Sequence, residues 1–242
     1  MAAAVSLRGG FDVISSWLFG TPANDYVKDI TILSRPYEKG RLLVSGNSYG
    51  GVSTSNIYTF FISDEGDLIG PGPGLKLPGV SEVHSLSTSP WSYWDNTNNE
   101  YSRNDVYASG LLFAAPTLSK VELAQSGSMQ PAWKINTNTT NASVPNGFSP
   151  DVEFLYEQRS SGIEPTIYTT GSSLTGTANY SPYITKYLED GTVRWRRDLS
   201  SAMDVIYQIE ADQYTSSNQD REEAIYISGT KKSIVAMIMN LY

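Results

Sequence analysis

The feature that most constrains the fold of this chain is an internal repeat. Four segments share a run of β-branched, aromatic or aliphatic residues that ends in Ser-Gly or Thr-Gly: RLLVSGNS (41–48), DVYASGLL (105–112), TIYTTGSS (166–173) and AIYISGTK (224–231). Their glycines, Gly46, Gly110, Gly171 and Gly229, are 64, 61 and 58 residues apart. A nearly constant period of this kind is typical of repeat architectures in which each repeat is one supersecondary unit. The sequence therefore predicts four equivalent units.

Each unit is predicted to be a four-stranded antiparallel meander. A short segment rich in β-formers precedes every glycine run, at 25–33, 80–87, 151–158 and 204–211. After the glycine run, the first three units contain a strand, a glycine-bearing turn and another strand, at 56–69, 118–135 and 181–199. Asp-Gly and Ser-Gly turns supply the positive φ that a tight hairpin needs. We place the units at about 25–79, 80–145, 150–200 and 204–242.

The fourth unit lacks its last strand, because the sequence ends after SIVAMIMNLY (233–242). A surplus β-like segment, GGFDVISSWLFG (9–20), stands before the first unit. We expect it to complete the fourth sheet and to close a ring, with Phe11, Val13 and Trp17 as the closing residues. Two alternatives remain open. The segment also has apolar residues at helical spacing, and it could insert into an adjacent subunit instead.

The predicted fold is therefore a single all-β domain over residues 1–242. It is a four-bladed β-propeller of four-stranded antiparallel blades, closed by the N-terminal strand. Composition agrees, because 40% hydrophobic and 17% charged residues suit a folded globule. The 16 tyrosines favour strands over helices.

The repeat units resemble the bacterial SBBP-type β-propeller repeat. The third unit is the most similar, with IYTTGSS followed by YITKYLEDGTVRW, which carries Trp195. The second unit matches in part through VYASG and Trp133, the fourth through IYISG and the first through LLVSG. The resemblance implies a propeller. It carries over no catalytic residue, because the shared positions of the family serve packing and turns.

Charge and composition argue against several partners. The formal net charge of −8 opposes binding to phosphate backbones, and the only cationic cluster, Arg194, Arg196 and Arg197, is expected to be a solvated strand face. No signal peptide is detected, and no apolar run approaches the ~18 residues that span a bilayer. We expect neither nucleic-acid binding nor membrane insertion.

No catalytic constellation can be assembled. His84 is the sole histidine, there is no cysteine, and neither a nucleophile elbow nor a phosphate-binding glycine loop is present. Asp64, Glu65 and Asp67 crowd one turn and could hold calcium, but ordinary turn chemistry explains them better. The sequence therefore predicts a non-enzymatic protein with no catalytic residue, no metal site and no cofactor.

The most suggestive binding segment is the insertion PWSYWDNTNNEY (90–101) in the second unit. It carries Trp91, Tyr93, Trp94 and Tyr101 among amide and carboxylate side chains. Such residues can stack on sugars or anchor a protein interface, and they can equally fold back as a small core.

The leading functional hypothesis is a structural or interaction module in a larger assembly, in a bacteriophage virion or tail or in a cell-surface complex. Its expected partners are other protein subunits, including copies of itself. A carbohydrate-binding, adhesin-like module that uses the 90–101 segment on a surface glycan is the alternative. A carboxylate-based enzyme at the propeller mouth is the third hypothesis.

Overall fold

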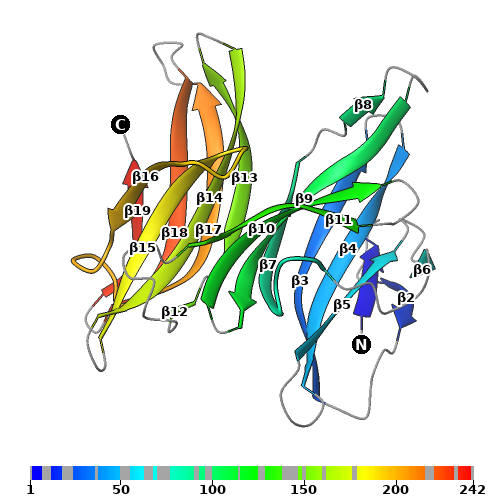
Figure 1. The fold of residues 1–242 in the computed structure, drawn as a ribbon, viewed down its shortest axis with the longest axis horizontal. Coiled ribbons are helices and arrows are strands. Elements are labelled where there is room, and N and C mark those ends of the chain that lie inside the picture. The colour runs from blue at the N-terminus through cyan, green and yellow to red at the C-terminus, as the bar shows by residue number, and fades with distance from the viewer. Residues whose placement is uncertain are drawn as a thin grey trace.

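The computed structural model describes the following residues: 2–6, 12–17, 24–35, 38–49, 55–62, 68–69, 77–89, 93–95, 100–113, 115–124, 129–137, 147–148, 151–159, 162–175, 179–215, 221–231 and 234–240. Every regular element in this part of the chain is a β-strand, and all strand pairs are antiparallel (Figure 1). The all-β prediction is confirmed. Among the described residues there is no helix that could cross a membrane.

The strands form one main sheet in each repeat unit. The first sheet consists of β3 (Asn24–Arg35), β4 (Glu38–Tyr49), β5 (Ser55–Ile62) and β6 (Leu68–Ile69), in that order. The second consists of β7 (Glu82–Thr88), β9 (Glu100–Leu112), β10 (Ala115–Ala124) and β11 (Met129–Asn136), with β8 (Tyr93–Asp95) paired to β9. The third consists of β12 (Gly147–Phe148) and β13 (Val152–Arg159), both paired to β14 (Gly162–Thr175), then β15 (Asn179–Leu188) and β16 (Val193–Asp198). The fourth consists of β17 (Val205–Thr215), β18 (Arg221–Lys231) and β19 (Ile234–Asn240).

The N-terminal segment forms a strand, as expected, but its partner is different. β2 (Asp12–Trp17) pairs with β1 (Ala2–Ser6), so that Val13 stands opposite Val5 and Trp17 opposite Ala2. In the described part of the chain β2 pairs with β1 and not with β19, and Phe11 lies outside the described residues, so closure of a ring by this segment stays a prediction. A strand that lies only a few residues away is the cheaper partner, because closing a short loop loses little chain entropy. The fourth sheet has three strands in the described part of the chain.

The main sheets pack face to face in chain order, and within the described ranges extensive contacts between main sheets are made by consecutive sheets only (Figure 1). Three hydrophobic clusters fill the three interfaces. Between the first and second sheets lie Leu33, Leu43, Val83, Leu86, Val106 and Val121. Between the second and third lie Tyr107, Leu118, Val152, Phe154, Ile167 and Tyr187. Between the third and fourth lie Tyr168, Ile184, Ile206, Ile209, Ile225 and Ile227. The two middle sheets thus bury both faces.

The repeated glycine allows the first two strands of a sheet to approach closely. A Cβ at Gly110 would overlap the carbonyl oxygen of Glu82, and one at Gly229 would overlap that of Val205. In both sheets the register of the first strand shifts opposite this glycine, as in a β-bulge. In these two sheets the repeat glycine therefore lies opposite a bulge in the first strand, whereas in the third sheet a Cβ at Gly171 would meet the ring of Tyr183.

The third sheet contains a buried ion pair that joins three of its strands. Glu157 of β13 and Lys186 of β15 form a salt bridge, and both are almost completely inaccessible to solvent. Glu157 also accepts hydrogen bonds from the Thr166 hydroxyl at 2.8 Å and the Tyr168 hydroxyl at 2.6 Å. The carboxylate thus has several donors in a region that excludes water.

Replacing Glu157 with Ala should lower the free energy of unfolding by about 3–5 kcal/mol, because it leaves Lys186 buried without its counter-ion. Urea denaturation measures this loss. The double variant Glu157→Gln, Lys186→Met should recover much of the stability, because it removes both charges while keeping similar volumes. Equal stability of the wild type and the Glu157→Ala variant would contradict the buried pair.

Candidate functional site

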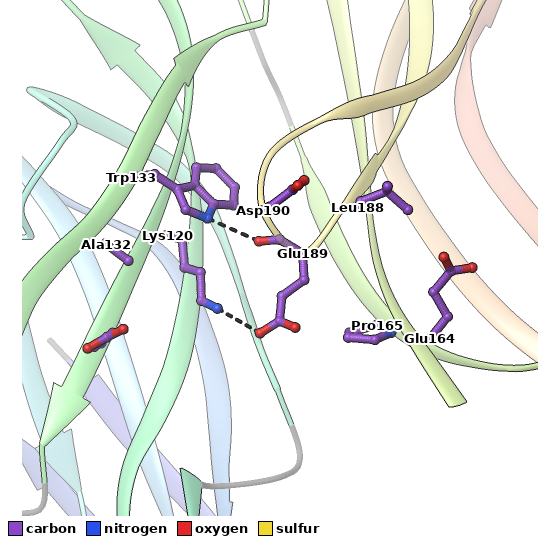
Figure 2. A pocket seen from close by; sticks show the side chains of 9 residues that line it. Lys120, Ala132, Trp133, Glu164, Pro165, Leu188, Glu189 and Asp190 are labelled. Carbon is purple, nitrogen blue, oxygen red and sulfur yellow. Dashed lines mark hydrogen bonds and ion pairs between the residues drawn. The ribbon is translucent and has the colours of Figure 1, made fainter. Parts of the chain in front are cut away.

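A cleft of about 480 Å³ lies between the second and third sheets (Figure 2). Strands β10 and β11 form one wall, and β14 with the turn between β15 and β16 forms the other. The lining residues are Lys120, Glu122, Ala132, Trp133, Glu164, Pro165, Leu188, Glu189 and Asp190. Its two walls come from different repeat units, so the cleft depends on how those units pack.

Lys120 ties the two walls together. Its ammonium lies 2.8 Å from Glu189 Oε1 in the third sheet and 3.0 Å from Asp105 Oδ2 in its own sheet (Figure 2 draws the first pair). Burial by itself would lower the pKa of Lys120, but the hydrogen bond to Glu189 and the charge of Asp105 outweigh it and raise the pKa. Lys120 therefore stays charged and acts as a structural cation, not as a proton donor near neutral pH.

Trp133 makes the second connection across the cleft. Its indole Nε1 donates to the backbone carbonyl of Glu189 at 3.0 Å, and its ring lies 3.5 Å from the place where a Cβ of Gly191 would stand. Gly191 has a φ of 85°, which confirms the predicted Asp-Gly turn. A side chain at this position would be strained by the backbone conformation. The glycine therefore shapes the turn that holds the carbonyl toward Trp133.

The lining of the cleft is mainly acidic. Among the described residues that line it, four carry carboxylates, Glu122, Glu164, Glu189 and Asp190, and one, Lys120, is cationic. Such a surface favours cationic groups and disfavours phosphates. Among the described residues, no group of three or more His, Asp or Glu side chains is placed to hold a metal ion.

A second polar feature, which we call the first-strand chain, connects the first strands of all four sheets. Asp29 Oδ2 of β3 accepts from Leu86 N at 2.6 Å, and Asp151 Oδ2 accepts from Ile209 N of β17 at 2.7 Å. Between them, Ser85 Oγ of β7 lies 2.9 Å from Asp29 Oδ2 and 2.5 Å from Asp151 Oδ1, and its single hydrogen can be donated to either carboxylate. Side chains of one sheet thus bond directly to the next sheet in line.

Glu153 lies two residues after Asp151, on the same side of β13. Burial raises the pKa of Glu153 to about 8, and three nearby carboxylates add to the shift, those of Glu210, Asp151 and Asp29. At neutral pH the folded protein therefore keeps a proton on this side chain. The first strands thus bring four acidic side chains near one another, and that of Glu153 is uncharged at neutral pH.

This pKa makes stability depend on pH. Between the unfolded value near 4.5 and the folded value of about 8, the folded chain holds a proton that the unfolded chain has lost. The free energy of unfolding should therefore fall as pH rises through this window, by a few kcal/mol at most, since one pKa unit is about 1.4 kcal/mol. Urea denaturation at about pH 5.5 and about pH 8.5 measures the fall.

Glu153→Gln should remove most of that fall, because the amide does not titrate. Glu164→Gln, in the cleft, is the matched control and should leave the fall in place. The same pH dependence in the Glu153→Gln variant and the wild type would contradict the assignment to Glu153.

The two end sheets each expose the face that the middle sheets bury. On β3, the exposed fractions of Ile30 and Ile32 are 48% and 60%. Ile30 is paired with the residue two positions before the repeat glycine, and the residues so placed in the other sheets are Leu86, Val152 and Ile209. The exposed fractions of these three are 5%, 1% and 2%. Each of these three packs against the preceding sheet. Before Ile30 the chain contains only the short two-stranded β1–β2 sheet among the described residues, and that sheet makes no extensive contact with β3.

The fourth sheet exposes the opposite face, the one that in the other sheets packs on the following sheet. Tyr226 of β18 stands three residues before its repeat glycine, and its exposed fraction is 43%. Its equivalents Leu43, Tyr107 and Tyr168 are fully buried, each in the cluster shared with the following sheet. We call the β3 face with Ile30 and Ile32 the head face, and the β17–β18 face with Tyr226 the tail face.

Three of the four predicted binding residues lie in described strands. Tyr93 and Trp94 lie in β8 and Tyr101 lies in β9, where Trp94 stands opposite Tyr101 and Tyr93 opposite Arg103. The insertion is thus a hairpin that extends the second sheet. Trp91 and the acidic turn at 63–67 lie outside the described residues. A binding role for the hairpin stays a prediction.

His84 and the arginine cluster both lie in described strands. His84 lies in β7, a first strand as expected, half-buried with Nε2 3.4 Å from Glu82 Oε1. The arginine cluster is only partly a solvated face. Arg194 pairs with Glu164 at 2.6 Å, whereas Arg196 donates to the Thr137 carbonyl at 2.9 Å and lies over the Tyr183 ring.

No protein-family model matches this chain, and no curated protein is significantly similar to it. The resemblance to the SBBP-type repeat therefore stays a prediction, and the function has to be argued from the geometry.

Proposed function

We propose that this protein is a non-enzymatic structural subunit that assembles with other protein subunits through its head and tail faces. The observation that carries the proposal is the burial difference between equivalent residues. Ile30 and Tyr226 are exposed, whereas their equivalents in the middle sheets are buried against a neighbouring sheet. The packing of one sheet on the next occurs three times within the chain. At each end of the stack, one of the two faces that form this packing is exposed.

The polar features support the same proposal. Lys120 and Trp133 both bond to Glu189 across the cleft, and the carboxylates of the first-strand chain bond to the following sheet. These groups therefore hold sheets together. A long-lived assembly needs such rigid subunits, because an interface loses affinity when its residues must first be ordered.

In the same proposal, the four sheets are propeller-type blades that pack in chain order without closing a ring within one chain. The packing of consecutive sheets and the bonds between their first strands support this arrangement. We also propose that the subunit belongs to a bacteriophage particle or a cell-surface complex, and this part of the proposal rests on the sequence alone.

An arginine at Ile32 should disrupt assembly without unfolding the subunit, because the side chain is largely exposed in the single chain. Sedimentation velocity over a range of concentrations should show multimers of the wild type and a shift of Ile32→Arg toward the monomer. Ile163→Arg is the matched control, since Ile163 of β14 is 62% exposed but belongs to neither face. A wild type that remains monomeric throughout, or an equal effect of both variants, would overturn the proposed function.

A further inference from the structure

We propose that the partner is a second copy of this chain and that copies join head to tail, with the tail face of one packed on the head face of the next. This inference rests on the proposed function and names its partner. It predicts a heterologous contact, which generates a ring if the rotation closes and a filament if it does not.

The interface between the second and third sheets is the model for the proposed contact between the tail face of one copy and the head face of the next. There Tyr107 stacks on Phe154, with ring centroids 5.2 Å apart and an interplanar angle of 15°. Tyr107 is the equivalent of Tyr226, since both stand three residues before the repeat glycine, and Phe154 is the equivalent of Ile32. The geometry therefore points to Tyr226 of one copy packing on Ile32 of the next.

The polar groups are complementary in the same register. Asp29, Ser85, Asp151 and Gln208 occupy equivalent positions in the four first strands. Carboxylates thus alternate with hydrogen-bond donors, and the donor Ser85 reaches Asp151 in the following sheet. Gln208 is the donor of the fourth sheet, and it is exposed. In a head-to-tail contact its amide would donate to Asp29 of the next copy.

A second copy fits better than closure within one chain. The first and fourth sheets lie at opposite ends of the long axis of the molecule (Figure 1). Bringing them together would require rearrangement of the three apolar interfaces that already bury the middle sheets. A head-to-tail copy covers both faces and leaves those interfaces unchanged.

The absence of cysteine from the chain allows a direct test by disulfide trapping. We would prepare Ile32→Cys and Tyr226→Cys as separate proteins, mix them under mild oxidation and separate the products on non-reducing gels. The mixture should give a crosslinked dimer in severalfold higher yield than either protein alone. The double variant should give a ladder of multimers. Ile163→Cys mixed with Tyr226→Cys is the control and should give background yield.

Three outcomes would overturn head-to-tail joining. A disulfide within the monomer of the double variant, without crosslinking in the mixture, would show closure within one chain and would also remove the proposed assembly through these faces. Crosslinking of Ile32→Cys to itself would show a like-to-like contact and leave the proposed assembly intact. A yield no higher than that of the control would exclude any such contact.

A charge variant gives a readout that does not depend on new disulfides. Gln208→Glu would place a carboxylate against Asp29 of the next copy, so its dissociation constant for self-association should rise at least tenfold at neutral pH. Gln208→Ser introduces the same donor that Ser85 provides in the second sheet. It should therefore weaken self-association less than Gln208→Glu does. An unchanged dissociation constant in Gln208→Glu would contradict the proposed register.

Discussion

The rest of the structure depends on one buried carboxylate, that of Asp151. It accepts from Val152 N at 2.9 Å, from Ile209 N at 2.7 Å and from the Ser85 hydroxyl at 2.5 Å, so it joins three consecutive sheets. Burial raises the pKa of Asp151, and these hydrogen bonds oppose that rise. A buried polar group is tolerated when its partners are fixed, and fixed partners define a single arrangement of the surrounding elements. The carboxylate therefore sets how the second, third and fourth sheets align.

The apolar interfaces follow from that alignment. Once the first strands are bonded in line, the face of each sheet that carries Leu43, Tyr107 or Tyr168 meets the face of the next that carries Leu86, Val152 or Ile209. The same alignment leaves Ile30 and Tyr226 partly exposed at the two ends. The exposed faces thus follow from a repeated arrangement whose first and last sheets make no extensive contact in the described part of the chain. Assembly with further subunits would complete the same packing.

Much of this fold could be predicted from the sequence, because the repeat glycine marks a backbone constraint. The first strands β3, β7, β13 and β17 coincide closely with the segments predicted for them. The partner of β2 could not be predicted, because its short alanine-rich neighbour β1 gives no strong strand signal. The first-strand chain was missed because its side chains vary from Asp to Ser to Gln at equivalent positions. The cleft was missed because its walls come from different units, and periodicity within one unit does not report contacts between units.

The stability of the Asp151→Ala variant tests the central claim most directly. Urea denaturation followed by circular dichroism and tryptophan fluorescence gives its free energy of unfolding. Removing the carboxylate leaves buried donors on two sheets without partners, so we expect one cooperative transition and a loss of about 2–4 kcal/mol. Asp190→Ala, in an exposed turn, serves as the control for losing a carboxylate at the surface. If Asp151→Ala unfolds with the midpoint and slope of the wild type, the sheets do not depend on this carboxylate and the account is wrong.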